Sequence, residues 1–143
     1  MIRWELHLKT IDWHVTVMYA VTCYNIGAVV RAMQDAGASD ANIKNARRLI
    51  ESRKLNQGLT YSNPSTRESV MVVALAESAE QYANSIAHER GHLVAQLTDI
   101  LGLDWRGEDP CYMAGELAQK MYDVDSQLVC PHCLWRIKSR FMD

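Results

Sequence analysis

Two histidines four residues apart are the side chains in this sequence best suited to holding a metal ion. They are His88 and His92, the first and last residues of the pentapeptide HERGH. On a helix, residues four apart project from one face about one turn from each other, so two ring nitrogens can bind one ion. A zinc ion takes about four ligands, and a catalytic site keeps one position for water. The spacing therefore predicts a site for one zinc ion that needs one further protein ligand.

The residue after the first histidine is an acid, Glu89. It is not expected to be a ligand, because on the helix it points beside the ion rather than at it. From there its carboxylate can take a proton from zinc-bound water as that water attacks a carbonyl carbon. We therefore expect Glu89 to be the base of a zinc-dependent peptidase or amide hydrolase, with a peptide or protein as substrate.

The third zinc ligand must come from a segment that returns after this helix. Asp99 shares a face with the second histidine but lies about 10 Å farther along the same helix, too far away to bind the same ion. Glu108 is the preferred ligand, because it comes after the expected chain reversal and four residues before Tyr112, whose phenol could hydrogen-bond a developing oxyanion. The alternatives are Glu116 and Asp109.

The HERGH pentapeptide lies inside a predicted helix that follows a predicted strand. Ser78 and Gln81 have the spacing of a capping box, which opens a helix that can run to the residue before Gly102, where it would end. The β-rich residues 69–76 come immediately before this helix and are expected to form a hairpin with residues 59–62. A strand followed by a capped helix is the setting that an HExxH motif requires.

The other segments complete an α+β fold. Further strands are expected at residues 2–8 and 13–19, and further helices at residues 25–33, from Ser39 or Asp40 onwards, and from an Asp109 N-cap and Pro110 to about Tyr122. In the second strand, side chains alternate between two faces, with Trp13, Val15, Val17 and Tyr19 on one and His14, Thr16 and Met18 on the other. We expect one zincin-like domain over residues 1–143, with a small, mostly antiparallel sheet packed on helices. Residues from about 124 to 143 are expected to be a C-terminal extension, as a solvated tail or an edge strand.

Length and composition exclude several classes of protein. The chain has 143 residues, of which 48% are hydrophobic and 22% charged, as in an ordinary globular domain. A formal charge of -2 provides no general attraction for a phosphate backbone, so nucleic acid is not an expected partner. No window reaches the roughly 18 apolar residues that span a bilayer, and the N-terminal residues do not resemble a secretory signal. We therefore expect a cytoplasmic protein without a membrane partner.

Three segments together resemble a group of small zincin-like proteins encoded by phages and prophages of gut bacteria. The segments are KLNQGLTYSNPSTRESVMVV, SAEQYANSIAHERGH and LGLDWRGEDPCYMAGELA, and the resemblance covers about residues 10 to 122. It implies a minimal gluzincin-type fold, in which an HExxH helix follows a strand and a later E-x-x-x-Y segment completes the site. The residues implied are His88, His92 and Glu108 as zinc ligands, Glu89 as base and Tyr112 as the accompanying tyrosine.

The sequence departs from the pattern of that group at Asp109 and Pro110, and a proline there could shift the helix start and weaken the case for Glu108. Members of the group are named peptidases largely from the motif. The alternative function is therefore a catalytically silent zincin fold that serves as a binding or structural protein, such as a virion component or an inhibitor of a host factor. A phage-encoded protein would act in the host cytoplasm or in the virion.

The tetrapeptide CPHC at residues 130–133 allows two kinds of chemistry. It matches the redox motif of thiol oxidoreductases, in which a helix amino terminus lowers the pKa of the first cysteine. Only ten residues follow it, however, and a thioredoxin-like fold needs more chain. As half of a zinc knuckle it would need two more ligands, and the only other thiols are Cys23 and Cys111. The remaining interpretation is ordinary thiols on the C-terminal extension.

Overall fold

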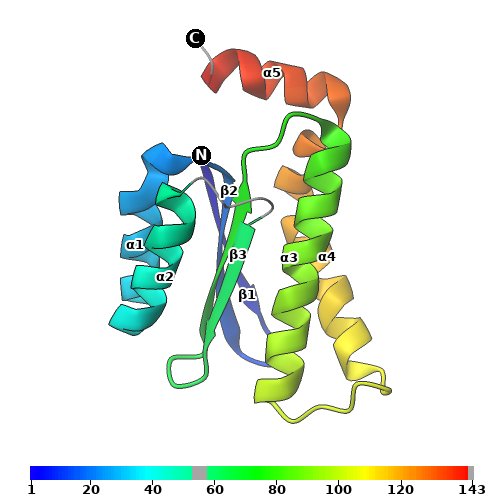
Figure 1. Ribbon diagram of the computed structural model, residues 1–143. Helices are drawn as coiled ribbons and strands as arrows, with labels where there is room; N and C mark the ends of the chain where they lie inside the picture. The colour runs from blue at the N-terminus through cyan, green and yellow to red at the C-terminus, as the bar shows by residue number, and fades with distance from the viewer. Residues whose placement is uncertain (53–57, 142–143) are drawn as a thin grey trace.

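A four-stranded mixed sheet lies at the centre of the fold (Figure 1). The computed structural model describes residues 1–52 and 58–141. The strands are β1 (Ile2–Leu8), β2 (Trp13–Val21), β3 (Gly58–Asn63) and β4 (Glu68–Ala74). Their order in the sheet is β1-β2-β4-β3, so β1 and β3 are the edge strands. The pairs β1–β2 and β3–β4 are antiparallel, and the pair β2–β4 is parallel.

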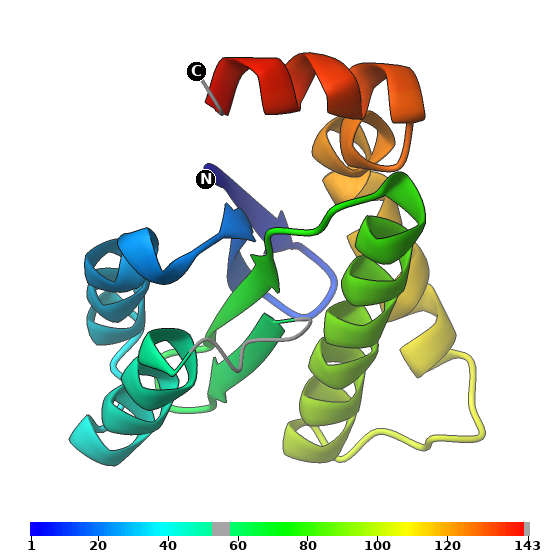
Figure 2. The same cartoon turned by 45° about the horizontal axis from the view of Figure 1, so that its top comes forward.

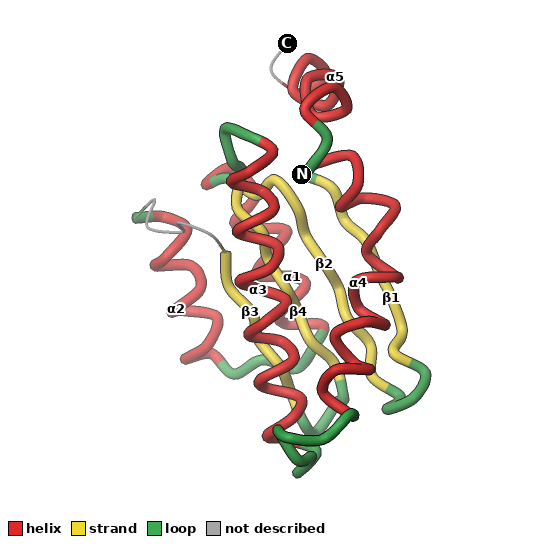
Figure 3. Tube along the Cα trace, turned by 90° about the vertical axis from the view of Figure 1, so that its right-hand side faces the viewer, coloured by secondary structure: helices red, strands yellow, loops and turns green. Residues whose placement is uncertain are grey.

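Helices cover both faces of the sheet (Figure 2). They are η1, a 3-10 turn (Cys23–Asn25), and the α-helices α1 (Ile26–Asp35), α2 (Asp40–Glu51), α3 (Ala79–Ile100), α4 (Asp109–Leu128) and α5 (Pro131–Phe141). Helices α1 and α2 lie on one side of the sheet, and α3 and α4 lie on the other. Figure 3 shows α3 and α4 side by side in front of the strands. The expected α+β class is confirmed, and two of the three strand pairings are antiparallel.

Alternation along β2 decides which side chains meet which helices. The face under α3 and α4 carries the four residues expected together, Trp13, Val15, Val17 and Tyr19. They pack with buried residues of the two helices, among them Leu93, Leu97, Leu117 and Met121. Met18 lies on the opposite face, in the core under α1 and α2. Burial of each such aliphatic side chain stabilises the fold by roughly 1.5–3 kcal/mol, so the sheet is held from both sides.

Caps determine where α3 begins and ends. The Ser78 hydroxyl accepts a hydrogen bond from the backbone N–H of Gln81 at 3.1 Å, and the Gln81 side chain accepts one from the backbone N–H of Glu77 at 2.9 Å. After the last turn, Gly102 has a φ of 65°, a left-handed conformation that favours glycine. The predicted start and end of the helix are confirmed, so HERGH lies in the middle of a 22-residue helix.

Helix α4 begins one residue earlier and ends later than the sequence indicates. Asp109 is already its first helical residue, and Glu108 takes the N-cap position without a side-chain cap hydrogen bond. The helix runs to Leu128 rather than to about Tyr122, because Val124 and Leu128 continue its buried stripe. The residues between them are polar and hide this continuation in the sequence, although Asp125 is itself buried.

The C-terminal extension is a helix, so the expected tail or edge strand is wrong. Within α5 the backbone N–H of Leu134 donates to the carbonyl oxygen of Cys130 at 2.8 Å. Leu134 is buried and Ile137, three residues later, packs against the same core. This helical spacing outweighs the alternation of polar and apolar residues at 136–140 that resembles a strand. The last two residues of the extension, and the residues KLNQ that precede β3, lie outside the described residues.

One buried polar network joins β2, α3 and α4. The Tyr19 hydroxyl donates to Asp125 Oδ1 at 2.7 Å, and Arg90 Nη1 lies 3.0 Å from Asp125 Oδ2. Burial raises the pKa of Asp125, while the hydrogen bond from Tyr19 and the charge of Arg90 act against that rise. Removing one member would leave buried polar groups without partners, so the network favours a single packing of the two helices on the sheet.

The raised pKa of Asp125 predicts a pH-dependent stability. Because the folded protein holds this proton more tightly than the unfolded chain does, the contribution of Asp125 is full below its ordinary pKa of 3.8 and is lost as pH rises through the raised value. Asp125→Asn cannot ionise, so the free energy of unfolding of the wild type should fall relative to that of the variant over this range. Urea unfolding at a series of pH values measures the difference. The control Asp123→Asn, an exposed position on the same helix, should show no such trend, and a difference for Asp125→Asn that does not vary with pH would contradict the prediction.

Candidate metal centre

His88 and His92 lie side by side on an exposed flank of α3. Their Nε2 atoms are 3.0 Å apart, and their ring planes are at 79° to each other. Two zinc–nitrogen bonds of about 2.05 Å at a tetrahedral angle place the nitrogen atoms about 3.3 Å apart. The observed separation is within a few tenths of an ångström of that value. The separation is that of a hydrogen bond between the two rings, and it would also allow the pair to supply two ligands to one zinc ion, so the zinc site stays a prediction.

Glu89, the predicted base, points from the same helix toward the sheet. Its side chain is buried, and Oε2 accepts a hydrogen bond of 2.6 Å from the hydroxyl of Thr60 on β3. The same hydroxyl lies 3.3 Å from the backbone carbonyl oxygen of Glu89. Within the described part of the chain, Oε1 accepts no hydrogen bond, so Thr60 holds the carboxylate by one oxygen only.

The first residue of the edge strand β3 must be glycine, because the backbone of β4 and the side chain of Glu89 both approach it closely. A Cβ atom at Gly58 would lie 2.9 Å from Cγ of Glu89 and 1.8 Å from the carbonyl oxygen of Val72. Any larger residue would therefore force the strand away from its neighbour and from the helix. The close approach of Gly58 to Glu89 places the Glu89 side chain next to the edge strand of the sheet.

The histidine pair continues the face of α3 that borders this edge strand. Gln96 donates from Nε2 to the carbonyl oxygen of Thr60 at 2.9 Å and accepts at Oε1 from the Ser62 hydroxyl at 2.7 Å. Gln96 is four residues after His92, which in turn is four residues after His88, so the three form one stripe along the helix. The stripe starts at the exposed imidazoles and ends against β3.

Helix α4, which carries the predicted third ligand, packs on the other flank of α3. Arg90 marks that flank, because it pairs with Asp125 of α4. Each histidine is two residues from Arg90, and two residues correspond to about 200° around the helix axis. The two imidazoles therefore point away from α4 and from its acids.

Glu108 is exposed at the start of α4 and is not brought to the histidine pair. His92 is eight residues before Ile100, the last residue of α3, which is about 12 Å along the helix axis. Glu108 follows the loop beyond that end. Across residues 1–52 and 58–141, no third His, Cys, Asp or Glu joins His88 and His92 in a group of ligand atoms within 4.8 Å. The assignment of Glu108 as a ligand stays a prediction.

The alternative acids and the predicted tyrosine lie near the β1–β2 turn. Glu116 accepts hydrogen bonds from the backbone N–H of Lys9 at 3.1 Å and from the Thr10 hydroxyl at 3.4 Å. It thereby ties α4 to the turn. Asp109 and the exposed Tyr112 line a cavity of about 790 Å³ that also borders Thr10. All three residues belong to this surface of α4 rather than to the flank with the histidines.

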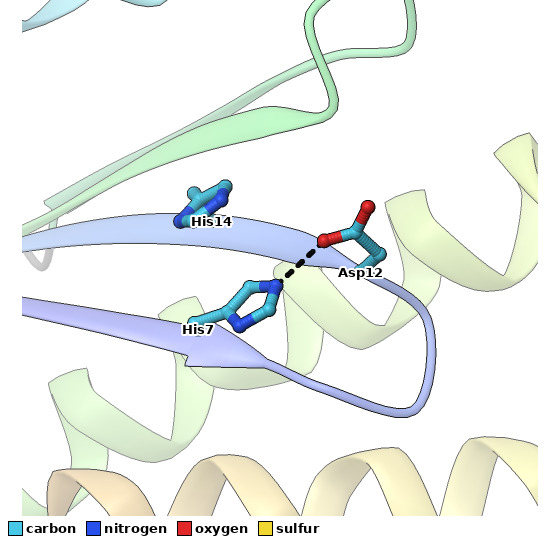
Figure 4. A group of neighbouring side chains, drawn as sticks. All are labelled: His7, Asp12 and His14. Carbon is cyan, nitrogen blue, oxygen red and sulfur yellow. Dashed lines mark hydrogen bonds and ion pairs between the residues drawn. The ribbon is translucent and has the colours of Figure 1, made fainter.

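Sequence reasoning misses a second group of ligand-type side chains. His7, Asp12 and His14 offer ligand atoms that all lie within 4.8 Å of one another (Figure 4), and the described residues contain no other such group of three. His7 and His14 are direct partners across the β1–β2 pair. The available signal is that both histidines lie at the same distance from the turn between the two predicted strands.

The CPHC thiols lie at the start of α5. The pKa of Cys130 is lowered by hydrogen bonds from the backbone N–H and the thiol of Cys133 and from the backbone N–H of His132. In the described chain neither thiol belongs to a group of three metal-ligand side chains, so Cys23 and Cys111 do not complete a zinc knuckle here. The local geometry is that of a cysteine pair at a helix amino terminus.

Comparisons with models of protein families, with curated proteins and with solved structures found no match. A search of the described helices for one long and apolar enough to cross a membrane also found none.

The hydrogen bond between Thr60 and Glu89 predicts a stability effect. Thr60→Val keeps a β-branched side chain on the strand but leaves the buried carboxylate without its hydroxyl donor, which should lower the free energy of unfolding by about 1–3 kcal/mol. Thr60→Ser keeps the donor and should lose much less. Urea unfolding of the two variants against the wild type measures the difference. Equal stability of Thr60→Val and Thr60→Ser would show that the hydroxyl does not stabilise the carboxylate.

Proposed function

We propose that the protein is a zinc-dependent hydrolase of peptide or related amide bonds, with a minimal zincin-like fold. The observation that carries the proposal is the exposed pair of Nε2 atoms 3.0 Å apart on α3, next to a buried carboxylate that the edge strand holds in place. This combination provides two zinc ligands and a base on one helix. The resemblance of the HERGH, TYSN and GEDPCYMAGE segments to small zincin-like proteins supports the same function.

The protein side chains divide the work of hydrolysis in this proposal. His88 and His92 would hold the ion. When bound, zinc would supply a Lewis acid that polarises a carbonyl group and makes water more acidic. Glu89 would take the proton of the attacking water at Oε1, because the Thr60 hydroxyl already occupies Oε2. Thr60 is a positioning residue, since it orients the base without touching the substrate.

A peptide substrate is favoured by the position of the site at the edge of the sheet. Strand β3 is an edge strand, so its outer backbone groups have no partner strand in the sheet. An extended peptide can pair with such an edge through main-chain hydrogen bonds. A peptide laid along β3 would pass the flank of α3 on which the two imidazoles are exposed.

Binding of a third zinc ligand requires part of the chain to move. Two histidines alone leave zinc short of the three protein ligands usual in a catalytic site. We keep Glu108 as the proposed third ligand, on the resemblance and on its place after the chain reversal. The loop between α3 and α4 and the start of α4 would have to shift for the carboxylate to reach the histidine pair.

Glu89→Gln tests the proposed base. The amide keeps the shape of the side chain but cannot take a proton, so hydrolysis should fall by about 10²–10⁴-fold while zinc is retained. Zinc content is measured by elemental analysis and turnover with a broad peptide library. Glu80→Gln, an exposed acid in the first turn of the same helix, is the control and should cleave at the wild-type rate. Equal cleavage by Glu89→Gln and the wild type would falsify this mechanism.

If the wild type binds zinc at the histidine pair yet cleaves no peptide in that library, the silent binding or structural module is the better interpretation. A stable complex with a virion or host protein would then support it. This outcome differs from loss of zinc, which would contradict the metal site itself.

Matched glutamine variants test the third ligand. Glu108→Gln should weaken zinc binding at the His88/His92 site by at least about tenfold. Glu116→Gln should leave zinc affinity at that site unchanged and should loosen the β1–β2 turn instead, because Glu116 accepts hydrogen bonds from Lys9 and Thr10. Zinc titration of both variants and of His92→Asn provides the comparison. Unchanged zinc affinity in Glu108→Gln would remove Glu108 from the site.

A further inference from the structure

We propose that the β1–β2 hairpin carries a second metal site, in which His7, Asp12 and His14 bind one divalent transition-metal ion such as Zn²⁺. The site lies at the turn end of the hairpin (Figure 4). It is separate from the histidine pair on α3 and does not depend on the proposed hydrolase activity. The proposal rests on the closeness of three ligand atoms, on a turn that other residues hold in place, and on the chemistry of the donor set.

The three side chains converge from both strands of the hairpin. His7 and His14 are cross-strand partners, so both project from the same face of the sheet. Their ring centroids are 4.4 Å apart. Nε2 of His7 lies 2.7 Å from Oδ1 of Asp12, and all three ligand atoms fit within 4.8 Å. The two rings are stacked at an interplanar angle of 17°, so they would have to turn toward each other to share one ion.

The turn that presents Asp12 is held by its own backbone and by Arg67. Asp12 has a φ of 50°, a left-handed conformation that aspartate tolerates better than most residues. Its backbone N–H donates to the carbonyl oxygen of Lys9 at 3.3 Å, and Nε of Arg67 donates to the carbonyl oxygen of Asp12 at 3.0 Å. A second guanidinium nitrogen donates to the carbonyl oxygen of Ile11. The carboxylate is therefore directed back toward His7 by a fixed turn.

Arg67 does not compete strongly for the carboxylate. Its hydrogen bonds go to the two carbonyl oxygens of the turn, and its guanidinium lies 5.3 Å from the ring centroid of Trp13. The side chain of Asp12 is 78% exposed and contacts His7. An incoming ion can therefore take the place of this single contact without breaking a buried ion pair.

Acidic and basic side chains both lie near His14. Glu68 is the partner of His14 on the other side of β2, in the parallel register with β4. Glu68, Glu5 and Asp35 line a small cavity of about 230 Å³ together with His14 and Arg3. Arg3 is paired with Glu5 at 2.8 Å. Arg67 and Lys120 also lie at the hairpin, where they donate to backbone carbonyl oxygens, so the charge around the site is mixed and the ligand atoms themselves carry the proposal.

The donor set selects the class of ion. Two imidazole nitrogens and one carboxylate oxygen suit zinc, nickel or copper, whereas magnesium and calcium prefer a shell made of oxygen atoms. Three protein ligands would leave room for water or a small anion on the solvent side. An ion in this position would link β1 to β2 at the turn end of the hairpin.

Imidazole NMR on the full chain tests the site. The variant His88→Asn/His92→Asn removes the pair on α3 and leaves His7, His14 and His132, each of which gives its own ring signals. Titration with Zn²⁺ should shift the ring nitrogens of His7 and His14 together, with one binding curve. Mg²⁺ at the same concentrations should not shift them. Shifts confined to His132, or no shift of the hairpin rings, would overturn the proposal.

Two further variants separate a metal site from a simple ion pair between His7 and Asp12. Asp12→Asn keeps a residue that tolerates the left-handed conformation but removes the carboxylate charge, so the dissociation constant for Zn²⁺ should rise by at least about tenfold. Asp123→Asn, at an exposed position on α4, should leave it unchanged. His14→Asn should abolish the shift at His7, which an ion pair without a metal does not require. If His14→Asn leaves the Zn²⁺-induced shift of His7 intact, the three residues do not form one site.

Discussion

The buried carboxylate of Glu89 sets how α3 is rotated against the sheet, and the rest of the candidate site depends on that rotation. A charged side chain taken out of water needs a partner, and Thr60 on the edge strand provides it. Gln96 binds the same strand two turns later. With these residues facing β3, the histidines four and eight positions before Gln96 are left on the exposed flank beside the edge. One polar seam between a helix and a strand thus decides which side chains reach solvent.

The same rotation of α3 decides which side of the candidate site α4 can reach with its side chains. Arg90 faces α4 and pairs with Asp125, which also accepts the hydroxyl of Tyr19. Both partners of this aspartate come from elements that precede α4 in the sequence, so α4 is held against β2 and α3 at once. The candidate ligands Glu108, Asp109 and Glu116 consequently lie along the β1–β2 turn and the chain reversal, away from the exposed imidazoles. For Glu108 to bind the same ion as the two histidines, the start of α4 would have to move from the position that this packing gives it.

The two groups of metal-type ligands differ in how the chain assembles them. His88 and His92 meet through helix periodicity alone, so they come together wherever this segment is helical. His7 and His14 meet through strand register, and Asp12 joins them through a turn whose carbonyl groups accept hydrogen bonds from Arg67, in the turn between β3 and β4. A one-residue slip of the register would turn one histidine to the other face of the sheet and remove the group. The hairpin cluster is therefore a tertiary feature, while the helical pair is a local one.

The sequence by itself determined the elements whose signals are local. Alternation in β2, the Ser78 cap and the glycine after α3 predict the sheet face and the HERGH helix, because each depends on neighbours within a few residues. Only the tertiary structure decided the length of α4 and the helical state of α5, since Leu128 and Leu134 are buried by packing against distant residues. It also decided which ligands meet. The spacing of His88, Glu89 and His92 is a local feature of five consecutive residues. The flank of α3 on which α4 packs depends instead on contacts between β2, α3 and α4, which no local sequence pattern contains.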